Sequence, residues 1–152
     1  MILSKEVKEK IIKEYNDWFE SQYANKSLEE RRELGAFFTP PEVTIKMIEM
    51  FSCDDLKNKT ILEPTLGAGG LLAGCIIAGA DPKLCFGNEI DYDILQIAKK
   101  RLMPMGVPEE NLHQGDANKD YCLTNFSKDY EYKENITDVG IAGQTAQNEV
   151  LW

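Results

Sequence analysis

The chain has 152 residues, of which 43% are hydrophobic and 28% charged, a composition typical of a globular domain rather than of a disordered segment. Its formal net charge of −9 argues against tight binding of duplex DNA by this chain alone, because phosphate contacts need clustered Lys and Arg. No apolar run reaches the roughly 20 residues of a membrane-spanning helix, and the N-terminus is charged too early for a signal peptide. We therefore expect a cytoplasmic protein with no membrane partner.

The cysteines predict no metal site. The chain has four of them, Cys53, Cys75, Cys85 and Cys122. They form no C-x-x-C pair, and the single histidine, His113, does not lie at metal-ligand spacing from them. We interpret all four as buried, reduced thiols.

The N-terminal part of the sequence is predicted to form a helical segment, residues 1–34, ahead of the main domain, residues 35–152. Apolar residues recur at helical spacing over residues 4–23. A capping-box pattern at residues 27–30 then opens a short second helix that ends before Gly35. We expect these helices to cover one side of a ligand crevice.

A third helix is predicted to begin at the Phe-Thr-Pro-Pro-Glu segment and to run through about Phe51. Thr39 would be its N-cap, Pro40 its first residue and Glu42 the reciprocal carboxylate.

From residue 60 onward, short strands alternate with helices. Strands are predicted at residues 60–63, 84–89, 111–115 and 137–142. The connecting helices are predicted at about residues 69–78 and 91–102, and we interpret the cationic run at residues 99–101 as a solvated helix end. This order predicts an α/β fold in which about four mostly parallel strands form a Rossmann-like sheet with right-handed crossovers.

A glycine-rich turn, residues 62–70, follows the first strand with the sequence Leu-Glu-Pro-Thr-Leu-Gly-Ala-Gly-Gly. Ligands bind at such strand ends in open α/β sheets. A dinucleotide-binding fingerprint would have glycine where Leu72 stands, and a P-loop would have a Gly-Lys pair that is absent here. Glu63 would repel a pyrophosphate but attract an ammonium group, so the turn favours a ligand with a cationic amino-acid end.

Two further carboxylates follow the next two strands. Glu89 lies about 20 residues beyond the glycine turn, the distance at which an acidic side chain binds ribose hydroxyls. Its two oxygens match two vicinal hydroxyl donors. Asp116 follows the third strand and can accept a hydrogen bond from an exocyclic amine such as adenine N6. Together the three strand ends predict an adenosine with a charged tail.

Four segments in this order resemble motifs of the adenine-specific (N6) DNA methyltransferases, including type I modification subunits. They are residues 35–40, Gly-Ala-Phe-Phe-Thr-Pro, then the glycine turn, residues 88–91, Asn-Glu-Ile-Asp, and residues 115–117, Gly-Asp-Ala. The resemblance implies S-adenosylmethionine as the cofactor. It assigns the methionine part to the Phe-Thr-Pro segment and the glycine turn, the ribose to the acidic residue after the second strand, and the adenine to the later Asp. Carried onto this sequence, the cofactor-binding residues are Phe38, Thr39, Glu63, Pro64, Gly67, Gly69, Glu89, Ile90 and Asp116.

The family's catalytic signature is Asp, Asn or Ser followed by Pro-Pro and an aromatic residue after the fourth strand, which holds an adenine flipped out of the duplex. Here residues 142–145, Ala-Gly-Gln-Thr, stand at that place, and no Pro-Pro-aromatic sequence follows Asp116. We therefore assign no catalytic residue and expect the chain to be inactive alone.

The resemblance implies a sheet of seven strands, as in the family, whereas only about four strands fit before Trp152. We accordingly expect a truncated methyltransferase domain that contacts DNA only through a missing or separate chain. An open sheet edge would be covered by a protein partner or in a homodimer.

Other interpretations stay open at this point. Residues 39–42 could be only a helix start, Gly69 and Gly70 could serve only close packing, and Trp18 and Phe19 are more often core residues than a base-stacking platform. The chain could also be a non-catalytic pseudo-methyltransferase with a regulatory or anti-restriction role, or could act on a small molecule, protein or RNA, because cofactor motifs do not identify the substrate.

Overall fold

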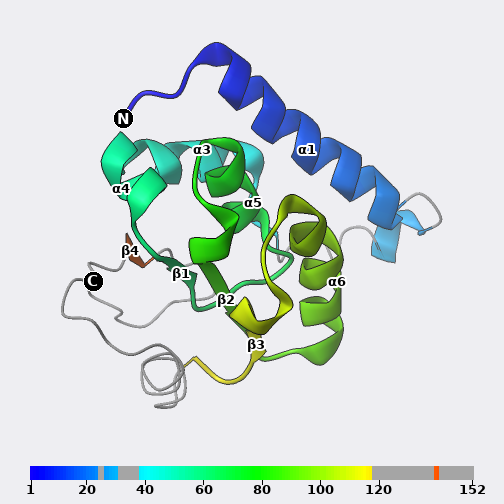
Figure 1. The fold of residues 1–152 in the computed structure, drawn as a ribbon. Coiled ribbons are helices and arrows are strands. Elements are labelled where there is room, and N and C mark those ends of the chain that lie inside the picture. Colours follow the sequence, from blue (N-terminus) through cyan, green and yellow to red (C-terminus); the bar gives the residue numbers. More distant parts are fainter. Residues whose placement is uncertain (24–25, 31–37, 118–138, 141–152) are drawn as a thin grey trace.

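The structure, a computed structural model, describes residues 1–23, 26–30, 38–117 and 139–140 (Figure 1). Several predictions lie outside these residues: the boundary at residues 34 and 35, the end of the second helix, the Gly-Ala-Phe start of the Phe-Thr-Pro motif, Cys122, and residues 142–145.

A four-stranded parallel sheet forms the centre of the fold. Its strands are β1 (Ile61–Glu63), β2 (Cys85–Glu89), β3 (Leu112–Gln114) and β4 (Val139–Gly140), arranged in the order β3-β2-β1-β4. All three neighbouring pairs are parallel. The predicted α/β sheet is therefore confirmed, and each strand falls within its predicted range.

Two helices connect the first three strands. α5 (Gly70–Ile77) joins β1 to β2 and carries no charged residue, so it is buried along most of its length. α6 (Tyr92–Leu102) joins β2 to β3 and begins at Asp91, whose side chain accepts hydrogen bonds from the backbone N–H groups of Asp93 and Ile94. Both helices were predicted, and both begin one residue after the predicted start.

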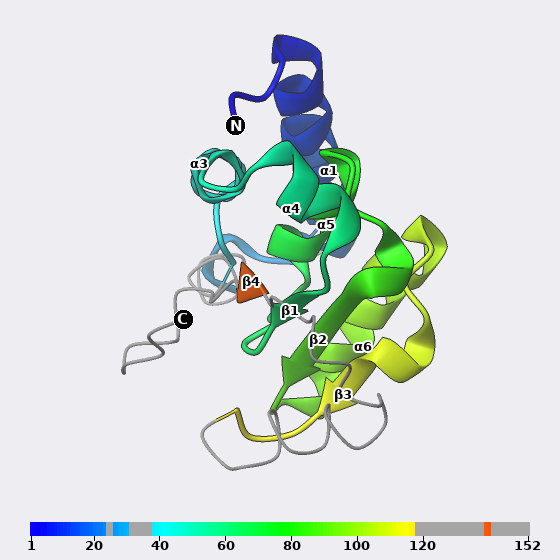
Figure 2. The ribbon, with the colours of Figure 1, turned by 60° about the vertical axis from the view of Figure 1, so that its left-hand side comes forward.

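The N-terminal helices pack on α5. α1 (Lys5–Tyr23) lies across α3 (Pro41–Glu49) and α5, on the side away from the strands (Figures 1 and 2). The capping box predicted at residues 27–30 is present, because the Ser27 hydroxyl accepts from the Glu30 N–H at 3.2 Å and the Glu30 carboxylate accepts from the Ser27 N–H at 2.7 Å.

The start of α3 differs from the prediction. Thr39 is not the N-cap: the cap is Pro40, the helix begins at Pro41, and no side chain caps it. The reason is that a residue before proline is driven to extended backbone, and Pro40 has φ −61° and ψ 148°. The interpretation of this segment as a capped helix start with Glu42 in a reciprocal bond is therefore wrong.

Short helical elements were missed. α4 (Cys53–Asn58) is capped by the hydroxyl of Ser52, which accepts from the Asp55 N–H at 3.0 Å. Three single 3₁₀ turns also occur in segments read as loops or strand starts, η1 (Pro82–Leu84), η2 (Met103–Met105) and η3 (Glu109–Asn111). Elements of three to six residues are too short to show a helical periodicity.

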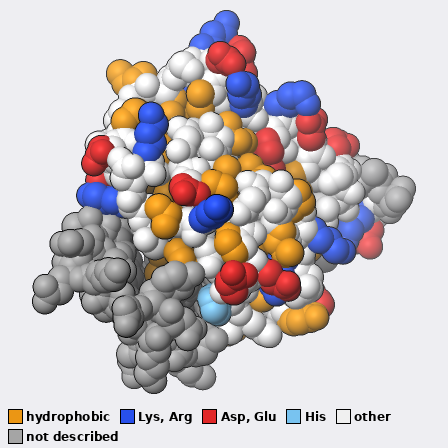
Figure 3. Space-filling model, in the orientation of Figure 1, with side chains coloured by type: hydrophobic (Ala, Val, Ile, Leu, Met, Phe, Trp, Pro, Cys, Tyr) orange, Lys and Arg blue, Asp and Glu red, His pale blue; other side chains and the backbone are white. Residues whose placement is uncertain are grey.

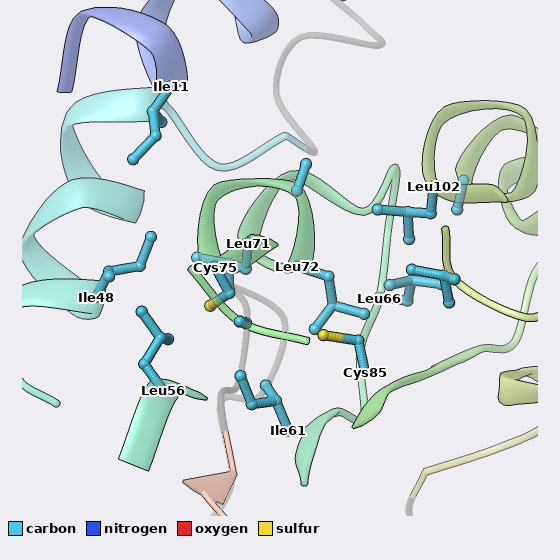
Figure 4. Close-up of a cluster of buried hydrophobic side chains, with 14 of the residues drawn as sticks. Ile11, Ile48, Leu56, Ile61, Leu66, Leu71, Leu72, Cys75, Cys85 and Leu102 are labelled. Atoms are coloured by element: carbon cyan, nitrogen blue, oxygen red, sulfur yellow. The ribbon is translucent and has the colours of Figure 1, made fainter. Parts of the chain in front are cut away.

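One hydrophobic core joins the N-terminal helices to the sheet (Figure 4). Ile11 of α1, Ile48 of α3 and Leu72 of α5 are all buried in it. Gly74 lets α3 approach α5 closely, since a Cβ at this position would lie 2.5 Å from Cγ2 of Thr44. The N-terminal helices are thus part of the structural unit that holds the sheet.

The cysteines only partly follow the prediction. Cys75 and Cys85 are buried free thiols, and burial raises the pKa of both, that of Cys85 to about 12. Cys53 is exposed, which corrects its interpretation as a buried thiol; it begins α4 on the surface, where its Sγ lies 3.0 Å from Sδ of Met1. Within the described ranges, no cluster of three or more His, Cys, Asp or Glu could hold a metal ion. Nor does any described helix have the length and apolar character to cross a membrane.

Candidate functional site

A cavity of about 510 Å³ lies where the carboxyl ends of β1, β2 and β3 meet. This is the expected position of a ligand site in an open α/β sheet, and the volume suits a small molecule. Eight of the nine predicted site residues line the cavity: Phe38, Thr39, Glu63, Pro64, Gly67, Glu89, Ile90 and Asp116. Gly69 does not line it.

The glycine turn uses backbone conformations that other residues adopt rarely. Gly67 has φ 53° and Gly69 has φ 78°. At Gly69 a Cβ would lie 2.7 Å from the Leu102 side chain, so this glycine permits close packing of α6 on the turn. At Gly67 nothing lies within 4 Å of an added Cβ, so its requirement is conformational.

Glu89 is oriented by the backbone around it. One carboxylate oxygen accepts from the Gly67 N–H at 2.8 Å and the other from the Asp91 N–H at 3.0 Å. The first bond fixes the end of β2 to the glycine turn. Each oxygen has a second lone pair for a further donor in the cavity.

Asn88 ties the three strand ends together. Its amide nitrogen donates to the carbonyl of Pro64 at 3.3 Å and to that of Gly115 at 2.9 Å, and its side chain is buried. Its Oδ1 is buried and accepts no hydrogen bond from the described residues, although Asn88 lines the cavity. A buried acceptor of this kind is costly unless a donor reaches it, which marks this wall as a place for a ligand donor.

Glu63 is a carboxylate at the base of the cavity, with 1% of its surface exposed. Its Oε1 accepts from both the N–H and the hydroxyl of Thr65, at 3.2 and 3.0 Å. A carboxylate buried this deeply favours a cationic partner over an anionic one.

Asp116 and Ile90 complete the strand-end side. The N–H of Gly115 donates to the carbonyl of Glu89 at 3.0 Å, which holds the segment containing Asp116 beside the end of β2. Ile90 is 63% exposed although it lines the cavity, so it presents apolar surface that a flat ring could cover.

Arg101 corrects the interpretation of residues 99–101 as a solvated helix end. Only 3% of its side chain is exposed, and it forms a two-point ion pair with Glu14 of α1. Its Nη1 donates to the carbonyl of Ala68 at 3.3 Å, and its guanidinium carbon lies 4.2 Å from the Trp18 ring centroid. Arg101 therefore links α6, α1 and the glycine turn, and it lines the cavity.

Aromatic side chains form another part of the wall, where Tyr15 and Phe38 line the cavity and pack in one cluster with Trp18 and Phe19. Trp18 and Phe38 meet edge to face with centroids 5.2 Å apart, and Tyr15 lies 6.1 Å from Trp18 and stacks on Phe19. Burial raises the pKa of Tyr15, the nearby Arg101 partly offsets this, and Glu42 adds to it. Trp18 is buried, as expected of a core residue, while Phe19 is only partly buried against the same cluster. Tyr15 lines the cavity, so α1 covers one side of the crevice, as was predicted of the N-terminal helices together.

The lining residues that were not predicted include Tyr15, Asn88 and Arg101. A signal existed for Arg101, which lies three and four residues after Ala98 and Ile97 and therefore continues the inward face of α6. Asn88 lies within a recognised motif, next to Glu89, but motif spacing alone does not show that it joins two loops. Tyr15 has no local signal, because its approach to the cavity depends on how α1 packs.

The hydrogen-bonding groups that line the cavity fit an adenosine with an amino-acid tail. The strand-end wall of the cavity carries acceptors, including the carboxylates of Glu63, Glu89 and Asp116 and the Oδ1 of Asn88. An ammonium group, two ribose hydroxyls and an exocyclic amine are all donors. A phosphate-bearing ligand would face three carboxylates, so the geometry disfavours nucleoside phosphates.

The family of the chain follows from comparison with known proteins. The model of the family described as N-6 DNA Methylase matches residues 8–140. The chain belongs to this family. It is also similar to the Type II methyltransferase M.VspI of Vibrio sp. (strain 343), with 28% identity over 103 residues, 67% of this chain and 23% of the relative. Among solved structures it is similar to the type I restriction-modification system methyltransferase subunit from Streptococcus thermophilus, with 26% identity and a TM-score of 0.48, over 56% of this chain and 20% of that one.

The resemblance derived from the sequence motifs is thus confirmed at the level of the family, and the chain is a region related to DNA N6-methyltransferases. This N-6 DNA Methylase chain spans 23% of the length of the curated relative it matches.

Proposed function

We propose that the cavity binds S-adenosylmethionine and that this chain supplies the cofactor-binding part of an adenine-specific DNA methyltransferase of the restriction-modification or phage type. The observation that carries the proposal is the convergence of acceptors from three adjacent strand ends in one cavity of a member of the N-6 DNA Methylase family. When bound, this cofactor supplies a methyl group activated by a sulfonium centre.

Each strand-end residue then has a distinct part in binding. Glu89 accepts from the ribose hydroxyls, already oriented by two backbone N–H groups. Asp116 accepts from the exocyclic amine of the adenine, and Ile90 covers the face of the ring. Glu63 attracts the ammonium group, and the glycine turn lets the backbone approach the methionine part.

The segment from Phe38 to Thr39 lines the cavity beside Gly70, the last residue of the glycine turn. Phe38 is buried against Trp18, so the position of Thr39 on the wall is set by packing as well as by the chain direction into α3. We assign this segment to the methionine part of the cofactor.

Methyl transfer to DNA would require residues that this sequence does not supply. Methyl transfer to an adenine would need a polar residue and an aromatic ring to hold the flipped base, and no metal ion. Residues 142–145 carry neither prolines nor a ring. We therefore propose that the isolated chain is inactive and that a second polypeptide, or a second copy, meets it at the sheet edge, in the cytoplasm.

The surface charge agrees with DNA contact through another chain. On the face shown in Figure 3, the acidic and basic side chains of the described residues are interspersed and form no single basic patch. With a net charge of −9, nonspecific attraction to phosphates is weak.

Calorimetric titration with S-adenosylmethionine tests the cofactor assignment. We expect a micromolar Kd for the wild type. Binding should be weaker by about 100-fold or more in Glu89→Ala, which loses bonds to two ribose hydroxyls, and by about 10-fold to 100-fold in Asp116→Ala, which loses one bond to the amine, because each bond between a charged group and the ligand is worth roughly 1.5–3 kcal/mol. Asp93→Ala is the matched control, an exposed carboxylate of α6 outside the cavity, and should bind like the wild type.

Absence of binding by folded wild-type protein would contradict the cofactor assignment. Incubating the chain alone with adenine-containing DNA and labelled cofactor tests the second part of the proposal. No label should enter the DNA, and methylation above background would show that the chain is a complete catalyst.

A further inference from the structure

Arg101 is held at the cavity wall with part of its hydrogen-bonding capacity left over. Its Nε and Nη2 donate to the two oxygens of Glu14 at 2.8 and 2.7 Å, and its Nη1 donates to the Ala68 carbonyl at 3.3 Å. A guanidinium has five N–H groups. Among the described residues these bonds use three, so one N–H on Nη1 and one on Nη2 remain for another acceptor.

The guanidinium lies beside the N-terminus of α5. A Cβ placed on Gly70, the first residue of that helix, would be 3.4 Å from Nη1 and 4.0 Å from both Nη2 and the carbonyl oxygen of Thr39. All three residues line the cavity. A positive side chain, the N–H groups of a helix start and the Phe-Thr-Pro segment therefore meet at one point of the wall.

The charges around the cavity are unevenly distributed. The described lining residues include four acidic side chains, Glu63, Glu89, Asp91 and Asp116, but a single Lys or Arg, which is Arg101. An amino-acid tail carries an ammonium and a carboxylate. Glu63 suits the ammonium, whereas a carboxylate next to these acidic groups would be repelled unless a cation accompanies it.

We propose that Arg101, together with the backbone N–H groups at the start of α5, binds the carboxylate of the ligand's amino-acid end. This inference rests on the proposed function. Glu14 is the positioning residue: its two bonds to the guanidinium fix the side chain, and Trp18 supports the guanidinium's face. Arg suits this role because its planar fork serves two acceptors at once.

The experiment compares two ligands that differ only in the carboxylate, S-adenosylmethionine and its decarboxylated analogue, by calorimetric titration. We expect the wild type to prefer the carboxylated ligand by at least tenfold. In Arg101→Met the preference should fall to about threefold or less, because the affinity for the carboxylated ligand drops while that for the analogue changes little.

A purely structural role for Arg101 gives a different pattern. The variant would then bind both ligands more weakly by the same factor, and the preference would stay at its wild-type value, which would overturn the inference. Equal affinity of the wild type for the two ligands would overturn it as well while leaving the proposed function standing. Failure of the wild type to bind either ligand would instead contradict the proposed function.

Two further variants keep the test decisive if Arg101→Met does not fold. Arg101→Lys retains the charge, but one ammonium cannot serve Glu14 and a ligand carboxylate in the same fork geometry, so the preference should fall severalfold. An unchanged preference in this variant contradicts the inference. Glu14→Gln leaves one acceptor in place of the two that fix the guanidinium, so the preference should fall, but by less than in Arg101→Met. Thermal unfolding of each variant shows that it is folded.

Discussion

The two walls of the cavity are held in place by different means. On the strand-end wall, Glu63 bonds to Thr65, two residues away, and Glu89 bonds to the backbone of Asp91, also two residues away, and of Gly67. On the helix wall, Arg101 is held by Glu14, which is 87 residues distant in the chain. The first wall is held by bonds within and between the strand ends, up to 27 residues apart in the chain, whereas the second exists only when α1 is docked.

Because of this difference, mutations in the two walls should change different properties of the protein, ligand affinity for the first wall and stability for the second. Removing an exposed side chain from the strand-end wall, such as that of Ile90, changes ligand contacts and leaves the core untouched, so affinity should fall without loss of stability. A substitution on the helix wall removes packing shared by α1, α3 and α6, so stability falls first and affinity follows.

Replacing Trp18 tests the helix wall and gives the larger expected effect. Trp18 is 8% exposed and contacts both Phe38 and Arg101, so Trp18→Ala removes a large buried ring and should lower the free energy of unfolding by about 3–5 kcal/mol. Urea unfolding followed by circular dichroism measures the change. Phe19→Ala, in the same aromatic cluster but only partly buried, should cost less, and an equal cost would show that α1 does not dock as described.

Replacing Ile90 tests the strand-end wall and gives the smaller effect. The side chain is 63% exposed, so Ile90→Ala should change the free energy of unfolding by less than about 0.5 kcal/mol. Burial of the Ile90 side chain under a ligand ring is worth about 1 kcal/mol. Without it, the affinity for S-adenosylmethionine measured by calorimetry should fall roughly fivefold. Tyr92→Ala, similarly exposed but outside the cavity lining, is the control; an equal loss there would remove Ile90 from the site.

The same contrast explains what sequence reasoning could predict. Glu63, Glu89 and Asp116 were predicted together because parallel strands bring their carboxyl ends to one edge, so a motif at each strand end is enough to place them. Arg101 was misread as part of a solvated cationic run, because its ion pair with Glu14 depends on a contact that no local pattern contains.

Local structure was misread for two physical reasons. Thr39 was expected to cap α3, but the second proline of the pair moves the helix start by one residue through its steric effect on Pro40. Cys53 was expected to be buried on the general behaviour of cysteines, whereas it begins the short helix α4 on the surface. The propensity of a single residue is a weak predictor of its local structure or burial where neighbouring residues or tertiary contacts decide them.

The central claim is that the cavity at the strand ends is where S-adenosylmethionine binds, and amide chemical shifts of ¹⁵N-labelled wild-type protein test it most directly. On titration with the cofactor, the signals of Gly67, Gly70 and Gly115 should shift, since these residues line the cavity, while those of Gly79 and Gly106, which do not, should stay unchanged. Shifts confined to residues outside the cavity, or none at millimolar cofactor, would contradict the account.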